Sequence, residues 1–205
     1  MKRWIALTTL TLAMASRLAT AADLPTARQA VDLANKRMSP QAQNQVLRIE
    51  GRHSDPQLRI RQWEVTFYDG TRVNNALTVR VEDGQVTSES SPLRMFEDGT
   101  WGHFDRNFTG FSNKEVINLS RWKIDSDSAL SKVLKLPRLS EVQITEVRML
   151  LRKLSDGDVP PVWRIHLRAR SKTDPSRETG IGYADLNAES GEILRNETRV
   201  GKLLK

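Results

Sequence analysis

The sequence predicts an α+β protein made of two similar halves, each an antiparallel sheet with one helix packed on one face. Residues 62–89 and 161–196 both alternate apolar and polar side chains with a period of two, which is typical of half-buried strands. A helix-forming segment precedes the strands in each half. Trp63 and Trp163 open the clearest alternations and stand one hundred residues apart. This shared register predicts a tandem duplication.

The first half is predicted over residues 22–92. Its helix takes Thr26 as N-cap, presents a stripe of small apolar residues, and ends before Pro40. A strand near residues 46–49 and a polar loop over 51–57 come next. The alternation that starts at Trp63 then gives a strand, and the Asp83-Gly84 step predicts a hairpin turn, because Gly takes a positive φ without steric cost.

Residues 93–124 break this pattern. They are rich in aromatic residues and glycine but show neither a strand period nor a helix period, and a disordered linker would not carry so many aromatics. We therefore expect an ordered connector that packs onto both halves. Its aromatic residues are Phe96, Trp101, Phe104, Phe108, Phe111 and Trp122.

The second half is predicted over residues 125–205. Ser126 or Asp127 is expected to cap a helix that Pro137 ends, and a long strand is expected within residues 141–154. The main strand starts at Val162, after two prolines. Its apolar positions belong to the core, so Trp163, like Trp63, is predicted to be buried.

Residues 1–21 predict a secretory signal peptide. Lys2 and Arg3 precede a short apolar run, and Ala19-Thr20-Ala21 offers a cleavage site before Ala22. We therefore expect an exported protein, periplasmic or secreted, with no transmembrane segment. The chain has no cysteine, so its fold cannot rely on disulfides. Cleavage would remove three cationic residues and lower the formal charge from +7 to +4, a modest excess for a soluble protein.

The second half resembles the PepSY domain, a small α+β module of exported bacterial proteins and protease propeptides. The resemblance consists of a capped helix, a strand, a W-x-I-x-L strand and a closing hairpin, and the matching residues are Trp163, Tyr183, Asp185, Gly191, Glu192 and Ile193. The first half matches less well, because its hairpin is shorter. Membership would imply a non-catalytic binding or inhibitory role against a protein or peptide, with no catalytic residues to carry over.

The best binding candidates are the polar side chains that alternate along the main strand, Arg164, His166, Arg168 and Arg170, and cationic residues of the preceding strand could lie beside them: Arg148, Arg152 and Lys153. A cationic row of this kind attracts the carboxylates of an acidic protein segment, and a free strand edge would let such a segment pair with the sheet. The alternative interpretation is an ordinary solvated face of an antiparallel sheet. No nucleic acid is expected as a partner.

Two other functions remain open on the sequence alone. One is an enzyme or small-ligand carrier with a cleft between the halves, lined by the connector around His103, Asp105 and Arg106; the other is an anionic-ligand binder that uses the basic sheet face. The three histidines are far apart, and two acidic loops that resemble calcium loops, at Asp125 and Asp185, lack the required later ligands. No nucleophile, phosphate-loop or zinc-protease motif is present, so we predict no metal, cofactor or catalytic residue.

Overall fold

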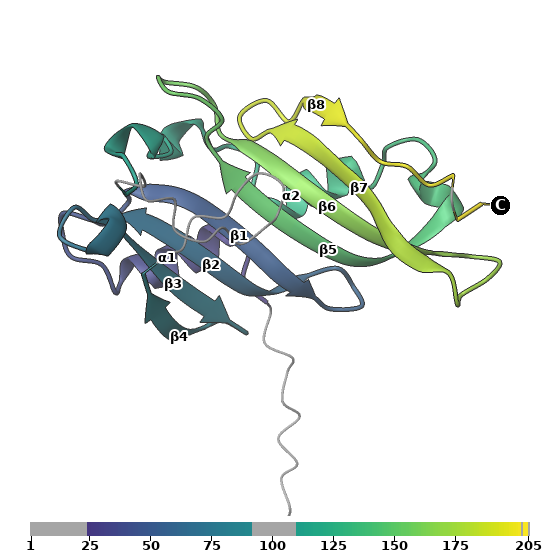
Figure 1. The fold of residues 1–205 in the computed structure, drawn as a ribbon, viewed down its shortest axis with the longest axis horizontal. Coiled ribbons are helices and arrows are strands. Elements are labelled where there is room, and N and C mark those ends of the chain that lie inside the picture. Colours follow the sequence, from purple (N-terminus) through teal and green to yellow (C-terminus); the bar gives the residue numbers. More distant parts are fainter. Residues whose placement is uncertain (1–23, 92–109, 202, 205) are drawn as a thin grey trace, which may run out of the picture.

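The computed structural model describes residues 24–91, 110–201 and 203–204, and its centre is one continuous antiparallel sheet. The eight strands follow the order β4-β3-β2-β1-β5-β6-β7-β8 (Figure 1). The predicted α+β class and antiparallel pairing are confirmed, but the two expected sheets are joined into one. The strands are β1 (Val46–Ser54), β2 (Ile60–Tyr68), β3 (Ala76–Glu82), β4 (Gln85–Ser90), β5 (Val142–Arg152), β6 (Val162–Ser171), β7 (Glu178–Asn187) and β8 (Ile193–Asn196).

Two α-helices, α1 (Ala27–Asn35) and α2 (Ser126–Val133), pack on the same face of this sheet (Figure 1). Thr26 caps α1 as predicted, since its hydroxyl accepts from the backbone N–H of Gln29 while the Gln29 side chain accepts from the N–H of Thr26. The predicted caps of α2, Ser126 or Asp127, were one or two residues late, because Asp125 is its N-cap. Four short 3-10 helices complete the described elements: η1 (Val73–Asn75), η2 (Asn113–Glu115), η3 (Leu119–Arg121) and η4 (Leu139–Glu141).

The helices and the sheet enclose one shared hydrophobic core. Trp63 and Trp163 lie at its centre with 1% and 0% of their surface exposed, and their ring centroids are 6.5 Å apart. Each indole N–H donates to the backbone carbonyl just before a helix N-cap, that of Trp63 to Pro25 at 2.8 Å and that of Trp163 to Ile124 at 2.9 Å. The predicted burial of both tryptophans is therefore confirmed, and each one fixes the start of a helix.

The sheet consists of two sets of strands, β1–β4 and β5–β8, and antiparallel pairing between β1 and β5 joins them. Glu50 stands opposite Leu150 and Arg48 opposite Arg152. The sequence predicted a polar loop from residue 51, but β1 continues to Ser54, because its residues pair with β2 as far as Ser54 opposite Ile60. Gly51 lies against the Trp63 ring and has no room for a side chain, since a Cβ there would lie 2.6 Å from that ring.

Both sets of strands use matching registers. Gly51 pairs with Trp63 between β1 and β2, and Leu151 pairs with Trp163 between β5 and β6, one hundred residues later on both strands. The two edge strands also carry one extra residue at matching places, Thr87 in β4 and Leu194 in β8. Such bulges blunt a sheet edge against pairing with another chain.

The described part of the connector, residues 110–124, contacts both sets of strands. The N–H of Phe111 donates to the carbonyl of Asn74 at 2.8 Å, and that of Ile117 to Val46 at 2.7 Å. Further along, the N–H of Lys123 donates to Ala188 at 2.9 Å, beside the turn between β7 and β8. The other connector aromatics, Phe96, Trp101, Phe104 and Phe108, and the predicted signal peptide lie outside the described residues. None of the helices in the described ranges is both long and apolar enough to cross a membrane.

Candidate binding face

The candidate residues lie on the face of the sheet opposite α1 and α2, which we call the open face. Along β6, Arg164, His166, Arg168 and Arg170 alternate with the buried residues Trp163, Ile165, Leu167 and Ala169. Since successive strand side chains point to opposite faces, the four predicted residues share the open face. His166 and Arg168 are exposed, whereas Arg164 and Arg170 are half-buried.

Neighbouring strands supply partners for the three arginines. Arg164 makes a bidentate pair with the buried carboxylate of Asp185 on β7, at 2.8 and 2.9 Å. Arg168 lies 3.5 Å from Glu146 and 3.4 Å from Glu178, and Arg170 donates to the side-chain oxygen of Gln143 at 2.9 Å. Much of the positive charge that the sequence suggested on β6 is therefore balanced from β5 and β7.

His166 adds an aromatic surface rather than a charge. Its ring lies 5.4 Å from that of Tyr183 on β7. Although part of the His166 side chain is exposed, desolvation by the side chains packed around its ring is the largest cause that lowers its pKa, and the nearby guanidinium groups of Arg148 and Arg164 lower it further. The imidazole is therefore neutral at neutral pH, so counting it as part of a basic row overestimated the charge there.

A second charged group, which the sequence did not reveal, lies where β1 meets β5. The carboxylate of Glu50, 5% exposed, accepts 2.8 Å hydrogen bonds from Arg52 on its own strand and from Arg148 on β5. Glu64 on β2 accepts from Arg80 on β3 at 2.9 Å. Periodicity did not place Glu50 beside Arg148, because the pairing of β1 with β5 is a long-range contact.

Burial by itself would raise the pKa of Glu50, but hydrogen bonds from Arg52 and Arg148 outweigh it and hold the pKa below 4.5. Because the pKa of Glu50 is lower in the folded protein than in the unfolded chain, its carboxylate stabilises the fold fully above pH 4.5. This contribution is lost as the pH falls through the folded pKa. Glu50→Gln should cost about 2–3 kcal/mol at neutral pH, since it leaves two guanidinium groups without their shared carboxylate.

Urea unfolding of the wild type and of Glu50→Gln between about pH 7 and pH 3 measures this effect. The difference between the two proteins should shrink as the pH falls. Glu89→Gln, on the exposed strand β4, is the matched control and should change little at any pH. A gap between wild type and Glu50→Gln that stays constant down to the lowest pH would contradict the prediction.

The expectation of a free edge on the main strand is wrong. Strand β6 is bonded to β5 on one side and to β7 on the other, and β4 and β8 are the edges. An extended partner therefore cannot pair its backbone with residues 162–170. Sequence alone did not reveal this because strand order depends on which distant strands pair.

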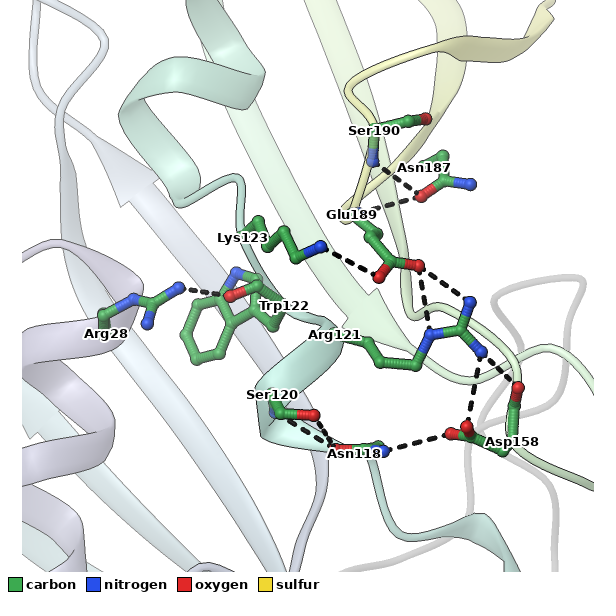
Figure 2. A network of polar contacts seen from close by, with 10 residues as sticks. All are labelled: Arg28, Asn118, Ser120, Arg121, Trp122, Lys123, Asp158, Asn187, Glu189 and Ser190. Carbon is green, nitrogen blue, oxygen red and sulfur yellow. Dashed lines mark hydrogen bonds and ion pairs between the residues drawn. The ribbon is translucent and has the colours of Figure 1, made fainter.

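The connector is fastened to the second set of strands by a network of polar contacts (Figure 2). Arg121 donates to one oxygen of Glu189 at 3.0 and 2.7 Å, and Lys123 lies 3.2 Å from the other oxygen. Asn118 donates to the carboxylate of Asp158 at 3.0 Å, and Arg121 donates to the carbonyl of the same residue. The hydrogen bond from Arg121 is the largest of the causes that lower the pKa of Glu189. These polar groups bond to one another, so we interpret the network as a structural one that holds the connector against the second set of strands.

The same network extends to the first helix. The guanidinium group of Arg28 lies over the ring of Trp122, 4.7 Å from its centroid, and donates to the carbonyl of that residue. The N–H groups of Ala27 and Arg28 donate to Ser126 and Asp125 at the start of α2, at 3.1 and 3.3 Å. The two helix N-termini are thereby linked.

The acidic loops weighed as calcium sites are engaged in these contacts: Asp125 caps α2, Asp185 holds Arg164, and Glu189 holds Arg121. Within the described ranges, no group of three or more His, Cys, Asp or Glu is arranged to hold a metal ion. His103, Asp105 and Arg106, the residues of the cleft hypothesis, lie outside those ranges. A shallow depression of about 350 Å³ beside the C-terminal segment is lined by Pro137, Arg138, Asn196, Thr198, Arg199, Val200 and Gly201.

Sequence reasoning found the β6 residues and placed Arg148 beside them, as the pairing of Arg148 with His166 confirms, but it missed Tyr183 and Arg195 as their neighbours. The open face brings these residues together across β5 to β8 by register, since Arg148 pairs with His166 and His166 with Tyr183. Tyr183 had been noted only as part of the PepSY-like pattern. Comparison with known proteins finds no match among protein-family models, curated proteins or solved structures, so the PepSY resemblance stays a prediction.

Proposed function

We propose that this protein is an exported, non-catalytic binding or inhibitory module that engages an extended protein or peptide segment through the open face of β5–β7. One observation carries the proposal: the face opposite the helices presents exposed cationic and aromatic side chains on strands whose other face is buried in the core. Such a rigid strand platform holds side chains in fixed positions for a partner.

We also propose that the two sets of strands are diverged copies of one PepSY-like unit. The registers repeat after one hundred residues, each copy has a tryptophan that bonds to the carbonyl before its helix, and each edge strand has a bulge at the same place. The copies have diverged on the open face. The cross-strand pair Arg164–Asp185 occupies the positions where the first copy has Glu64–Arg80, so the charges are exchanged.

Binding by side chains fits this architecture better than strand addition. The main strand is internal, and both edges carry bulges. It also fits better than a cleft between the copies, because β1 and β5 are joined by backbone pairing and both copies share one core. The proposed partner is acidic, since arginines from three strands flank the face.

Selection of peptides from a displayed random library on the purified protein tests this function. Acidic, extended peptides should be enriched, and their binding should weaken with added salt because exposed charges are screened. The double variant Arg168→Gln/Arg170→Gln should bind the selected peptides about fivefold to tenfold more weakly. Arg164 is left intact, because its replacement would leave the buried Asp185 unpaired and destabilise the fold.

Arg61→Gln is the matched control, since Arg61 is an exposed arginine paired with Asp83 at the far hairpin. It should bind the peptides as the wild type does. Failure to enrich any peptide, equal binding by the double variant, or cleavage of bound peptides would each overturn the proposed function.

A further inference from the structure

A cluster centred on Tyr183 stands out within the open face. Its half-buried ring lies 4.4 Å from the guanidinium group of Arg164, 5.6 Å from that of Arg195 and 5.4 Å from the ring of His166. These four residues come from β6, β7 and β8, so three strands converge on one aromatic side chain. A tyrosine in such a setting offers an aromatic surface flanked by hydrogen-bond donors.

The cluster is held in place from beneath. The buried carboxylate of Asp185 grips Arg164 through two hydrogen bonds and fixes it against the Tyr183 ring. Arg164 therefore serves to hold the cluster together rather than to contact a ligand. The two arginines at the sides are more exposed: Arg195 at 57% and, beyond His166 on β5, Arg148 at 47%.

Each of these flanking arginines shares its carboxylate with another arginine. Arg195 lies 3.1 Å from Glu197, which also lies 3.4 Å from Arg199. Arg148 donates to Glu50, which also accepts from Arg52; Arg52 lies 3.7 Å from Glu64 as well, and Glu64 accepts from Arg80. On both sides of Tyr183 the guanidinium groups therefore outnumber the carboxylates by one, and the resulting positive field favours negatively charged groups.

The spacing of the two arginines suggests the shape of the ligand. Arg148 on β5 and Arg195 on β8 lie three strand spacings apart across the sheet, about 14 Å, and Arg195 is opposite Asp185, two residues along β7 from the row of Arg148, His166 and Tyr183. An extended peptide advances about 13 Å over four residues. Two acidic side chains four positions apart therefore match the two arginines, with the side chain midway between them above Tyr183 and His166.

We propose that this cluster is the recognition site of the protein, and that it binds an extended peptide with two acidic residues four positions apart and an aromatic or apolar residue between them. The inference rests on the proposed function and deepens it: Arg148 and Arg195 bind the two carboxylates, and Tyr183 with His166 receives the central side chain. The first copy lacks this arrangement, because Thr78 stands in β3 where the second copy has Tyr183 in β7.

Fluorescence anisotropy with two labelled peptides tests the site, one with the core Glu-Gly-Phe-Gly-Glu and one with both Glu replaced by Gln. The acidic peptide should bind about tenfold more tightly than the Gln peptide. Arg195→Gln and Arg148→Gln should each weaken the acidic peptide about fivefold and leave the Gln peptide unchanged. Tyr183→Leu should weaken both peptides, whereas Tyr183→Phe, which keeps the ring, should bind both normally.

Arg80→Gln is the matched control on the open face of the first copy, where Arg80 pairs with Glu64. It should change binding less than about twofold. Circular dichroism melting of each variant identifies any that has failed to fold, and binding is compared among the variants that keep the wild-type melting temperature. Equal losses in Arg80→Gln and Arg195→Gln would overturn the site, and so would displacement of the peptide by inorganic phosphate at the same concentration as by unlabelled acidic peptide.

The outcomes also separate this inference from the proposed function. If library-selected peptides bind and depend on Arg168 and Arg170 but not on Tyr183 and Arg195, the Tyr183 site is wrong and the binding function stands. If neither the designed peptide nor any selected peptide binds, both are wrong.

Discussion

Replacing Trp163 with alanine is expected to lower the free energy of unfolding by about 3–5 kcal/mol, because it removes a large, fully buried side chain and leaves a cavity. It also removes the donor that bonds to the carbonyl of Ile124, just before the N-cap of α2. Trp63→Ala should have an effect of similar size, because Trp63 is equally buried and makes the matching bond to Pro25.

Urea unfolding of the two single variants and of the double variant measures these effects. Since the two rings are 6.5 Å apart in one core, the double variant should differ from the sum of the single variants by more than about 0.5 kcal/mol. Leu154→Ala is the control, because Leu154 is an exposed large hydrophobic residue and its loss should cost little. A Trp variant whose midpoint matches that of Leu154→Ala would refute its place in the core.

The second large effect is expected at Gly182, where β7 bends beneath the C-terminal segment. Its φ is +106°, and a Cβ at this position would lie 2.1 Å from the backbone carbonyl oxygen of Glu197. Gly182→Ala must therefore strain the backbone and push the C-terminal segment away. The expected cost is about 2–4 kcal/mol, from backbone strain and steric overlap together.

Gly180, two residues earlier on the same strand, provides a close control. A Cβ at Gly180 meets no atom within 4 Å, so Gly180→Ala should change stability by less than about 1 kcal/mol. Thermal melting of both variants, followed by circular dichroism, makes the comparison. Equal melting temperatures for the two variants would show that the C-terminal segment does not lie against Gly182.

Local patterns predicted most of the individual elements. The N-cap Thr26, the long strand within residues 141–154 and the burial of Trp63 and Trp163 all follow from side-chain periodicity and capping chemistry, which act over a few residues. The same patterns placed Arg164, His166, Arg168 and Arg170 on one face of a strand, as the structure has them. They did not identify the carboxylates opposite, because those belong to other strands.

The sequence by itself determined the α+β class, the antiparallel strands and the side of each strand that faces the core, because these depend on neighbouring residues. Only the tertiary structure decided that β1 pairs with β5, that one sheet replaces two, and that β6 is internal. It also decided that Asp185 holds Arg164 and that Tyr183 lies between Arg164 and Arg195. These contacts join residues far apart in the chain, and their register is chosen by the burial of a common core, which no local pattern specifies.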